Sequence, residues 1–250
     1  MQFVTINKDE DLATITMNRG KVNAFNDALV DDLRQAFRES EKDSQTSALI
    51  LTGSGKFFSF GFDISHFLGY SKEEFVHYLG HFTDFYTEVF LFPKPVIAAI
   101  NGHATAGACM LATACDHRIM ARGRAKISIN EIGFGSSIFA GSVEMLKFCV
   151  GERIAQTMLY SGAMYTGDQA LKMGLVDQTV SEENLLAQAR TVAQEFAQKD
   201  ARAFRSIKLL LRGPVAEAMR SRETASIQEF VDIWYSPETW RHLQEIKIRD

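Results

Sequence analysis

From Val96 to Met110 the chain reads Val-Ile-Ala-Ala-Ile-Asn-Gly-His-Ala-Thr-Ala-Gly-Ala-Cys-Met. The apolar run at its start predicts a buried strand, because a short continuous apolar run is typical of a strand covered on both faces. The small residues from Thr105 to Ala114 predict a helix that packs closely on its neighbours. Gly102 and Gly107 mark the turn between them, where a backbone without a Cβ atom can bend tightly and approach a ligand. The stretch therefore predicts an α/β fold with a binding site at this turn.

A second stretch repeats this plan. The apolar strand Ala48 to Thr52 is followed by Gly55-Lys-Phe-Phe-Ser-Phe-Gly-Phe-Asp-Ile64. Free backbone N–H groups at such turns can bind an anion, and two that point at one place form an oxyanion hole. The candidate base is Glu131, within Ile127-Ser-Ile-Asn-Glu-Ile-Gly133. An oxyanion hole and one carboxylate are the minimum set for moving a proton next to a carbonyl group.

The composition indicates a globular protein: 250 residues, 46% hydrophobic, 23% charged, with a net charge of −4. This charge gives no general affinity for nucleic acid or an anionic membrane, and no apolar run approaches the ~20 residues of a membrane span. The three cysteines have no paired spacing, and the N-terminus begins directly with a strand-like pattern. We therefore expect a cytoplasmic protein without a signal segment and without nucleic-acid or membrane partners. His77 and His81 have a spacing that can bind zinc, but no third ligand is evident, so no metal site is expected.

Helices dominate the second half of the chain. After a helix that Ser181 would cap, the pattern predicts separate helices near 201–212 and 215–235. We expect residues 1–195 to form the substrate-binding core and residues 196–250 a helical oligomerisation region. This last part contains apolar residues that look exposed and that we expect to contact another subunit, namely Phe230, Ile233, Trp234, Tyr235 and Trp240.

Several short segments, in this order and at these spacings, resemble the crotonase (enoyl-CoA hydratase/isomerase) superfamily along nearly the whole chain. They are Met17–Ala24, Phe57–Ile64, Lys94–Gly102, Cys115–Ile119, Gly167–Ala170 and Met173–Asp177. The resemblance implies an α/β fold built as a spiral of ββα repeats, with a C-terminal helical region. It also implies an acyl-CoA thioester substrate, no cofactor apart from the coenzyme A of the substrate, and a homotrimer or dimer of trimers.

The resemblance further implies that the N–H groups of Phe62 and Gly107 form the oxyanion hole and that Glu131 is the acid/base. The family's hydratases have a second glutamate three residues after the glycine of the second segment, where this chain has Met110. A thioether cannot act as a general base, so a site with one carboxylate is suited to moving a single proton. In this the chain resembles the Δ3,Δ2-enoyl-CoA (dodecenoyl-CoA) isomerases. We expect Glu131 to remove a proton from C2 of a 3-enoyl-CoA and to return it to C4.

Apolar neighbours of Glu131 (Ile127, Ile129, Ile132 and Phe134) predict a raised pKa for its carboxyl group. Coenzyme A would bind mainly through the backbone, at residues that match the family's positions near the adenine and pantetheine. These are Val22, Ala24, Ser59, Phe60, Gly61, Asp63 and Ile64. Lys21 and Lys56 are candidate phosphate contacts, and Lys247 is the candidate basic residue from the C-terminal tail. We expect Asp63 itself to cap a helix or organise its loop.

Two alternatives remain open from the sequence. The first is a hydratase, or another enzyme that forms a thioester enolate, in which His103, Glu88 or Glu144 supplies a second acid. The second is a non-catalytic protein that uses the same fold for binding or assembly.

Overall fold

The computed structural model of the chain describes residues 1–245. Its larger sheet has six strands in the order β1-β2-β3-β5-β7-β10, in which β1 and β2 pair antiparallel and all other neighbours pair parallel. The bounds are Val4–Asp9 (β1), Leu12–Met17 (β2), Ala48–Gly53 (β3), Val96–Ile100 (β5), His117–Ala121 (β7) and Gln178–Val180 (β10). The continuous apolar runs of β3 and β5 are buried along their whole length, as a parallel sheet covered on both faces requires.

A smaller sheet holds the strands that follow those of the larger sheet. Its order is β4-β6-β8-β9, with bounds Phe57–Ser59 (β4), His103–Thr105 (β6), Lys126–Ser128 (β8) and Tyr165–Thr166 (β9). Along the chain β3 leads to β4, β5 to β6 and β7 to β8, and a helical segment follows each pair. The predicted ββα repeats are therefore confirmed. Because β4, β6 and β8 run parallel, the turns that follow them lie at the same end of the small sheet.

The helices of the first half are α1 (Asp27–Lys42), α2 (Ile64–Phe67), α3 (Lys72–Phe90) and α4 (Gly107–Ala114). Those that follow are the 3₁₀ helix η1 (Glu131–Phe134), α5 (Ala140–Val150), α6 (Glu152–Ser161), α7 (Gly167–Met173), the 3₁₀ helix η2 (Glu182–Asn184), α8 (Leu185–Ala197), α9 (Ala201–Trp234) and α10 (Pro237–Glu245). Among residues 1–245, no helix combines the length and apolar composition that a membrane crossing requires.

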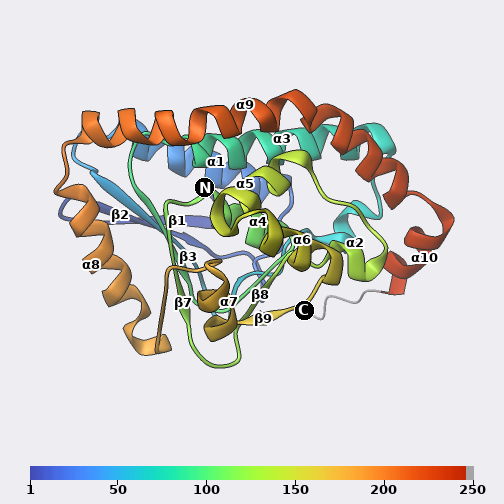
Figure 1. Ribbon diagram of the computed structural model, residues 1–250, viewed down its shortest axis with the longest axis horizontal. Coiled ribbons are helices and arrows are strands. Elements are labelled where there is room, and N and C mark those ends of the chain that lie inside the picture. The colour runs from blue at the N-terminus through green and yellow to red at the C-terminus, as the bar shows by residue number, and fades with distance from the viewer. Residues whose placement is uncertain (246–250) are drawn as a thin grey trace.

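Two helix predictions were wrong in detail. Ser181 does not cap a long helix; it precedes the short η2, makes no capping hydrogen bond, and α8 begins only at Leu185. The two helices expected near 201–212 and 215–235 are one continuous α9, with Pro214 inside it. A proline in a helix interior costs ~3 kcal/mol, so packing along the length of α9 must outweigh it. Figure 1 shows the reason: α9 runs along α3 across the molecule, and it also contacts α5.

The apolar residues near the end of α9 and in α10 that were expected to be exposed do not form an exposed face. Phe230 and Trp234 are buried, and Ile233, Tyr235 and Trp240 are partly buried. Phe230 packs on Phe139 with ring centroids 4.7 Å apart, and Trp234 packs on Phe75 at 4.8 Å. The expected exposure of these side chains was therefore wrong, because α9 lies on the core of its own chain.

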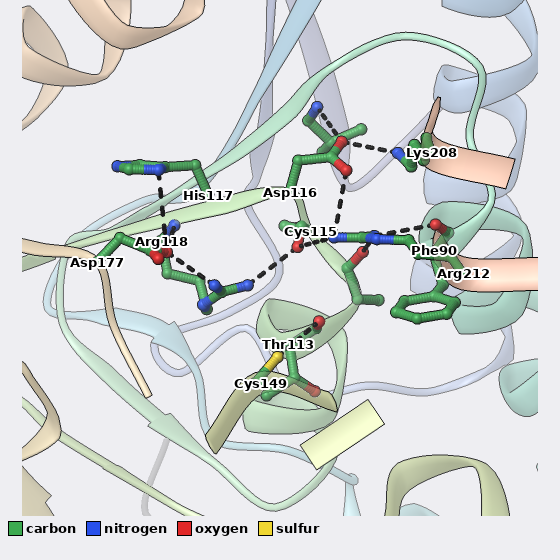
Figure 2. A network of polar contacts seen from close by, with 12 residues as sticks. Phe90, Thr113, Cys115, Asp116, His117, Arg118, Cys149, Asp177, Lys208 and Arg212 are labelled. Carbon is green, nitrogen blue, oxygen red and sulfur yellow. Dashed lines mark hydrogen bonds and ion pairs between the residues drawn. The ribbon is translucent and has the colours of Figure 1, made fainter. Parts of the chain in front are cut away.

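Buried charges attach the first half of α9 to the core (Figure 2). The carboxylate of Asp116 lies 2.7 Å from Lys208 Nζ and 3.2 Å from Arg212 Nη2, and it accepts from the Val96 N–H at 2.9 Å. Arg212 also donates to the carbonyl oxygens of Phe90 and Ala114, at the C-terminal ends of α3 and α4. Each charge is thus paired and hydrogen-bonded, which a buried charge requires.

Candidate active site

The loop before α1 is hydrogen-bonded to the turn after β4. The Phe25 N–H donates to Gly61 O at 2.7 Å, and Phe25 O accepts from the Asp63 N–H at 2.9 Å. Phe25 thus pairs with both neighbours of Phe62 and leaves the N–H of Phe62 outside this pairing. No hydrogen bond among residues 1–245 uses the Phe62 N–H as a donor. The loop pairing therefore holds this N–H group in place while keeping it free for a ligand.

The N-terminus of α4 supplies the second free N–H group. Gly107 is the first residue of α4, and the first N–H groups of a helix have no partner within it. The preceding Ala106 has φ 53° and ψ −125°, a conformation that costs a non-glycine residue on the order of 1–3 kcal/mol and is typical of functional turns. Within the described part of the chain, the Gly107 N–H donates to no acceptor.

The two turns meet at Gly61, which has φ 89°. A Cβ atom there would lie 2.7 Å from Thr105 O and 3.4 Å from Gly107 N, so only glycine permits this approach. The Thr105 hydroxyl donates to Phe60 O at 2.8 Å and ties the turns together. Two free N–H groups thus lie on adjoining turns, which is the arrangement that an oxyanion hole needs.

Glu131 lies at the start of η1, directly after β8. Its side chain is buried, with 2% of the residue exposed, and neither carboxylate oxygen has a hydrogen-bond partner among residues 1–245. Desolvation by burial raises the pKa of Glu131 to about 8, although the nearby N–H groups of Glu131 and Asn130 oppose this change. The predicted direction of the pKa shift is confirmed. One of the expected apolar neighbours does not contribute, because Ile132 points outward and is 49% exposed.

A cavity of about 160 Å³ connects these elements. Its lining consists of Phe60, Phe62, Ile64, Thr105, Ala106, Asn130, Glu131, Phe134, Met164, Phe230 and Trp234. Of the described residues that line it, Glu131 alone carries an ionisable side chain. The site therefore offers one buried acid/base group beside two unpaired N–H groups, in apolar surroundings.

The residues expected to bind coenzyme A differ in their burial and in whether they line this cavity. The Phe60 N–H donates to Val22 O at 2.9 Å, which joins their two segments, and Phe60 and Ile64 line the cavity. Ala24 and Ser59 are buried, while Lys21 is exposed at the surface. Lys247 lies outside the described residues.

Asp63 organises its loop, as predicted. It caps α2 by accepting from the His66 N–H at 3.2 Å, and it pairs with Arg19 at 2.7 Å. Both contacts hold the turn that carries Phe62.

A sequence model described as "Enoyl-CoA hydratase/isomerase" matches residues 7–240 of the chain. The chain belongs to the enoyl-CoA hydratase/isomerase family. It is 33% identical over 207 residues to the crotonyl-CoA hydratase of Syntrophomonas wolfei, covering 82% of this chain and 79% of that protein. It is 34% identical over 196 residues to a short-chain-enoyl-CoA hydratase of Clostridium acetobutylicum, covering 77% and 74%. The structure of human mitochondrial Δ3-Δ2-enoyl-CoA isomerase is similar at a TM-score of 0.90 and 28% identity, covering 97% of this chain and 96% of that one. Its relatives thus include both reaction types of the family.

None of the alternative second acids of a family hydratase is among the residues that line the cavity. His103 packs on the ring of Phe57, and Glu88 pairs with Arg34. Glu144 pairs with Lys147 and Arg222. Met110 is fully buried in α4.

One member of the histidine pair at helical spacing makes polar contacts of its own. His81 contacts Asp31 and Arg34, and no cluster of residues in the described range is arranged to hold a metal ion.

Sequence reasoning missed several residues that build this family site. Asn23 is fully buried at φ 51°, and its amide donates to Ser54 O and Phe57 O, so it fixes the loop that carries Phe25. Asparagine tolerates positive φ better than most residues, and this is the one local signal that could have revealed its role. Met164 and the α9 aromatics reach the cavity from distant segments, for which no local pattern gives a signal.

Proposed function

We propose that this chain is an isomerase that converts 3-enoyl-CoA to 2-enoyl-CoA. The observation that carries the proposal is the single carboxylate of Glu131 in a cavity whose other described lining residues cannot exchange a proton near neutral pH. Hydration needs a water molecule that is positioned and activated, usually between two carboxylates. Moving a double bond needs one group that takes a proton and returns it.

The proposed reaction would use these groups in two proton transfers. The thioester oxygen would accept hydrogen bonds from the N–H groups of Phe62 and Gly107, and Glu131 would remove a proton from C2. The electron pair of that C–H bond delocalises into a dienolate, whose negative charge rests on the thioester oxygen. Glu131 then returns the proton to C4, and the double bond ends between C2 and C3. Losing one oxyanion donor typically costs about 2.7–4 kcal/mol of transition-state stabilisation.

The raised pKa of Glu131 supports the acid/base role. With a pKa of about 8, the carboxyl group of the free protein is largely protonated at pH 7. Its carboxylate form is a stronger base than an exposed glutamate would be, and its acid form is available to reprotonate C4. A single carboxyl group whose pKa lies near neutral pH can therefore accept the proton from C2 and donate it to C4.

The remaining parts of the proposal concern binding and assembly. We expect coenzyme A to bind along Lys21, Val22, Ala24 and the turn 59–64, as part of the substrate and with no separate cofactor. A homotrimer or dimer of trimers stays a prediction, as does the oligomerisation role of residues 196–250 and a cytoplasmic location. The exposed apolar side chains of Ile207, Leu210 and Leu211 on α9 give that role a candidate surface.

A hydratase is the second candidate, because curated relatives at 33% and 34% identity are hydratases. The two reactions are separated by a paired assay on purified protein, one cuvette with a 3-enoyl-CoA and one with a 2-enoyl-CoA. We expect formation of the conjugated thioester in the first and no loss of it in the second. Rapid loss of the conjugated thioester in the second cuvette would identify a hydratase instead.

The same assay tests the role of Glu131. Glu131→Gln keeps the size of the side chain and removes the base, so we expect activity to fall by ~10²–10⁴-fold. Glu217→Gln, at an exposed position of α9, is the matched control and should retain full activity. Retained activity in Glu131→Gln would contradict the mechanism.

A further inference from the structure

We propose that Phe230 and Trp234 close the inner end of the cavity and restrict the enzyme to short acyl chains, of about four to six carbons. This inference rests on the proposed function, which sets where the thioester lies.

The exposure of the lining residues shows which end of the cavity is open. Phe60 is 37% exposed and Met164 40%, so the mouth lies between them. Phe230 and Trp234 are each 1% exposed and form the inner end. Because Phe60 belongs to the turn expected to hold pantetheine, the acyl group of a bound thioester extends from the mouth toward the two aromatic rings.

The inner end is packed too tightly to yield easily. The rings of Phe230 and Trp234 stack with centroids 5.7 Å apart, and behind them lie the fully buried rings of Phe75 and Phe139. Close-packed aromatic cores resist insertion of even one extra methylene group. A longer chain would therefore have to displace the core itself.

Polar contacts fix α9 on both sides of these two residues. Before them, Glu223 accepts from the Gly141 N–H at 2.6 Å and Ser226 accepts from the Ala140 N–H at 2.9 Å, which ties α9 to the start of α5. After them, the Tyr235 hydroxyl donates to Tyr70 O at 2.6 Å. The part of α9 that carries the rings is thus held at both ends.

A larger groove of about 640 Å³ has a different set of lining residues from the cavity. Ile129, Ile132 and Ile233 are among the residues that line this groove. Their sequence neighbours Glu131 and Trp234 line the cavity instead. The same two segments therefore separate the groove from the cavity. A long acyl chain would reach the groove only if this wall moved.

The volume sets the limit. An apolar cavity of ~150 Å³ can hold one benzene molecule, which has six carbon atoms, so a cavity of about 160 Å³ has room for a group of similar size. The thioester carbon and oxygen take part of this space. A twelve-carbon chain, as the resemblance to dodecenoyl-CoA isomerases would suggest, does not fit.

The test is a chain-length series of 3-enoyl-CoA substrates with six, eight, ten and twelve carbons. We expect kcat/KM of the wild type to fall by roughly 10–200-fold at the first length that exceeds the cavity. Phe230→Leu and Trp234→Leu should move that fall to longer chains. Trp240→Leu removes an indole that stacks on Tyr235 outside the cavity and should leave the series unchanged.

A binding series with the saturated thioesters, measured by calorimetry, separates this inference from the proposed function. If no substrate is isomerised but affinity still falls beyond six carbons, the proposed reaction fails and the length limit stands. Equal kcat/KM for six and twelve carbons in an active wild type, or equal affinity in an inactive one, would overturn the length limit. A limit that stays in place in both folded leucine variants would overturn the roles of Phe230 and Trp234.

Discussion

Replacing Glu131 with glutamine should make the protein more stable, and increasingly so as the pH rises. The carboxyl group is buried without a hydrogen-bond partner among residues 1–245, and its pKa is raised from 4.5 to about 8. The folded protein therefore keeps the proton up to about pH 8, whereas the unfolded chain releases it near pH 4.5. Because the folded state binds more protons in this window, the free energy of unfolding falls as the pH rises through it.

The magnitude follows from the pKa difference. The pKa differs by about 3.5 between the folded and unfolded states, and each pKa unit corresponds to 1.36 kcal/mol. The free energy of unfolding is therefore about 5 kcal/mol lower where Glu131 is ionised in both states than where it is protonated in both. Between pH 5 and pH 9 the wild type should lose about 4 kcal/mol relative to Glu131→Gln, whose amide does not titrate. This is a large share of the 5–15 kcal/mol that typically stabilises a domain.

Urea unfolding followed by circular dichroism at pH 5, 7 and 9 measures this difference. Glu217→Gln is the control, because its carboxylate is exposed in α9, and it should follow the wild type at each pH. If wild type and Glu131→Gln change stability in parallel from pH 5 to 9, the carboxylate is solvated or paired. Glu131 would then not be a buried, desolvated base.

Three further predictions concern catalysis and stability. The kcat/KM for a 3-enoyl-CoA should rise with pH and level off above about pH 8, because the free enzyme needs the Glu131 carboxylate; a flat profile from pH 6 to 9 would contradict this. Gly61→Ala should lower kcat by roughly 10²–10³-fold, because its Cβ would press on the facing turn and displace an oxyanion donor. Gly55→Ala, also at positive φ but in open space, should remain active in the same assay. Asp116→Asn should lower the free energy of unfolding in urea by about 3–5 kcal/mol, because it leaves the buried cations of Lys208 and Arg212 without their carboxylate. Lys208→Met should lower it clearly less, because Arg212 still pairs with Asp116.

Local patterns predicted several of the elements correctly. The apolar runs of β3 and β5 and the cap at Asp63 follow from neighbouring residues, and each is present in the structure. The separate helices expected near 201–212 and 215–235 were wrong, because contacts with α3 and α5 hold α9 as one helix through Pro214. The exposure expected for the α9 aromatics was wrong for the same reason.

The sequence by itself determined the fold class, the family and the residue types at the site. Adjacent residues encode a strand that leads through glycine into a helix. The sequence also states directly that a glutamate stands at position 131 and a methionine at position 110. Only the tertiary structure showed that the turns of Phe62 and Gly107 adjoin, that Glu131 is desolvated, and that α9 closes the cavity. Desolvation, pKa and cavity volume depend on how closely distant segments approach one another, and no local stretch of sequence contains that distance.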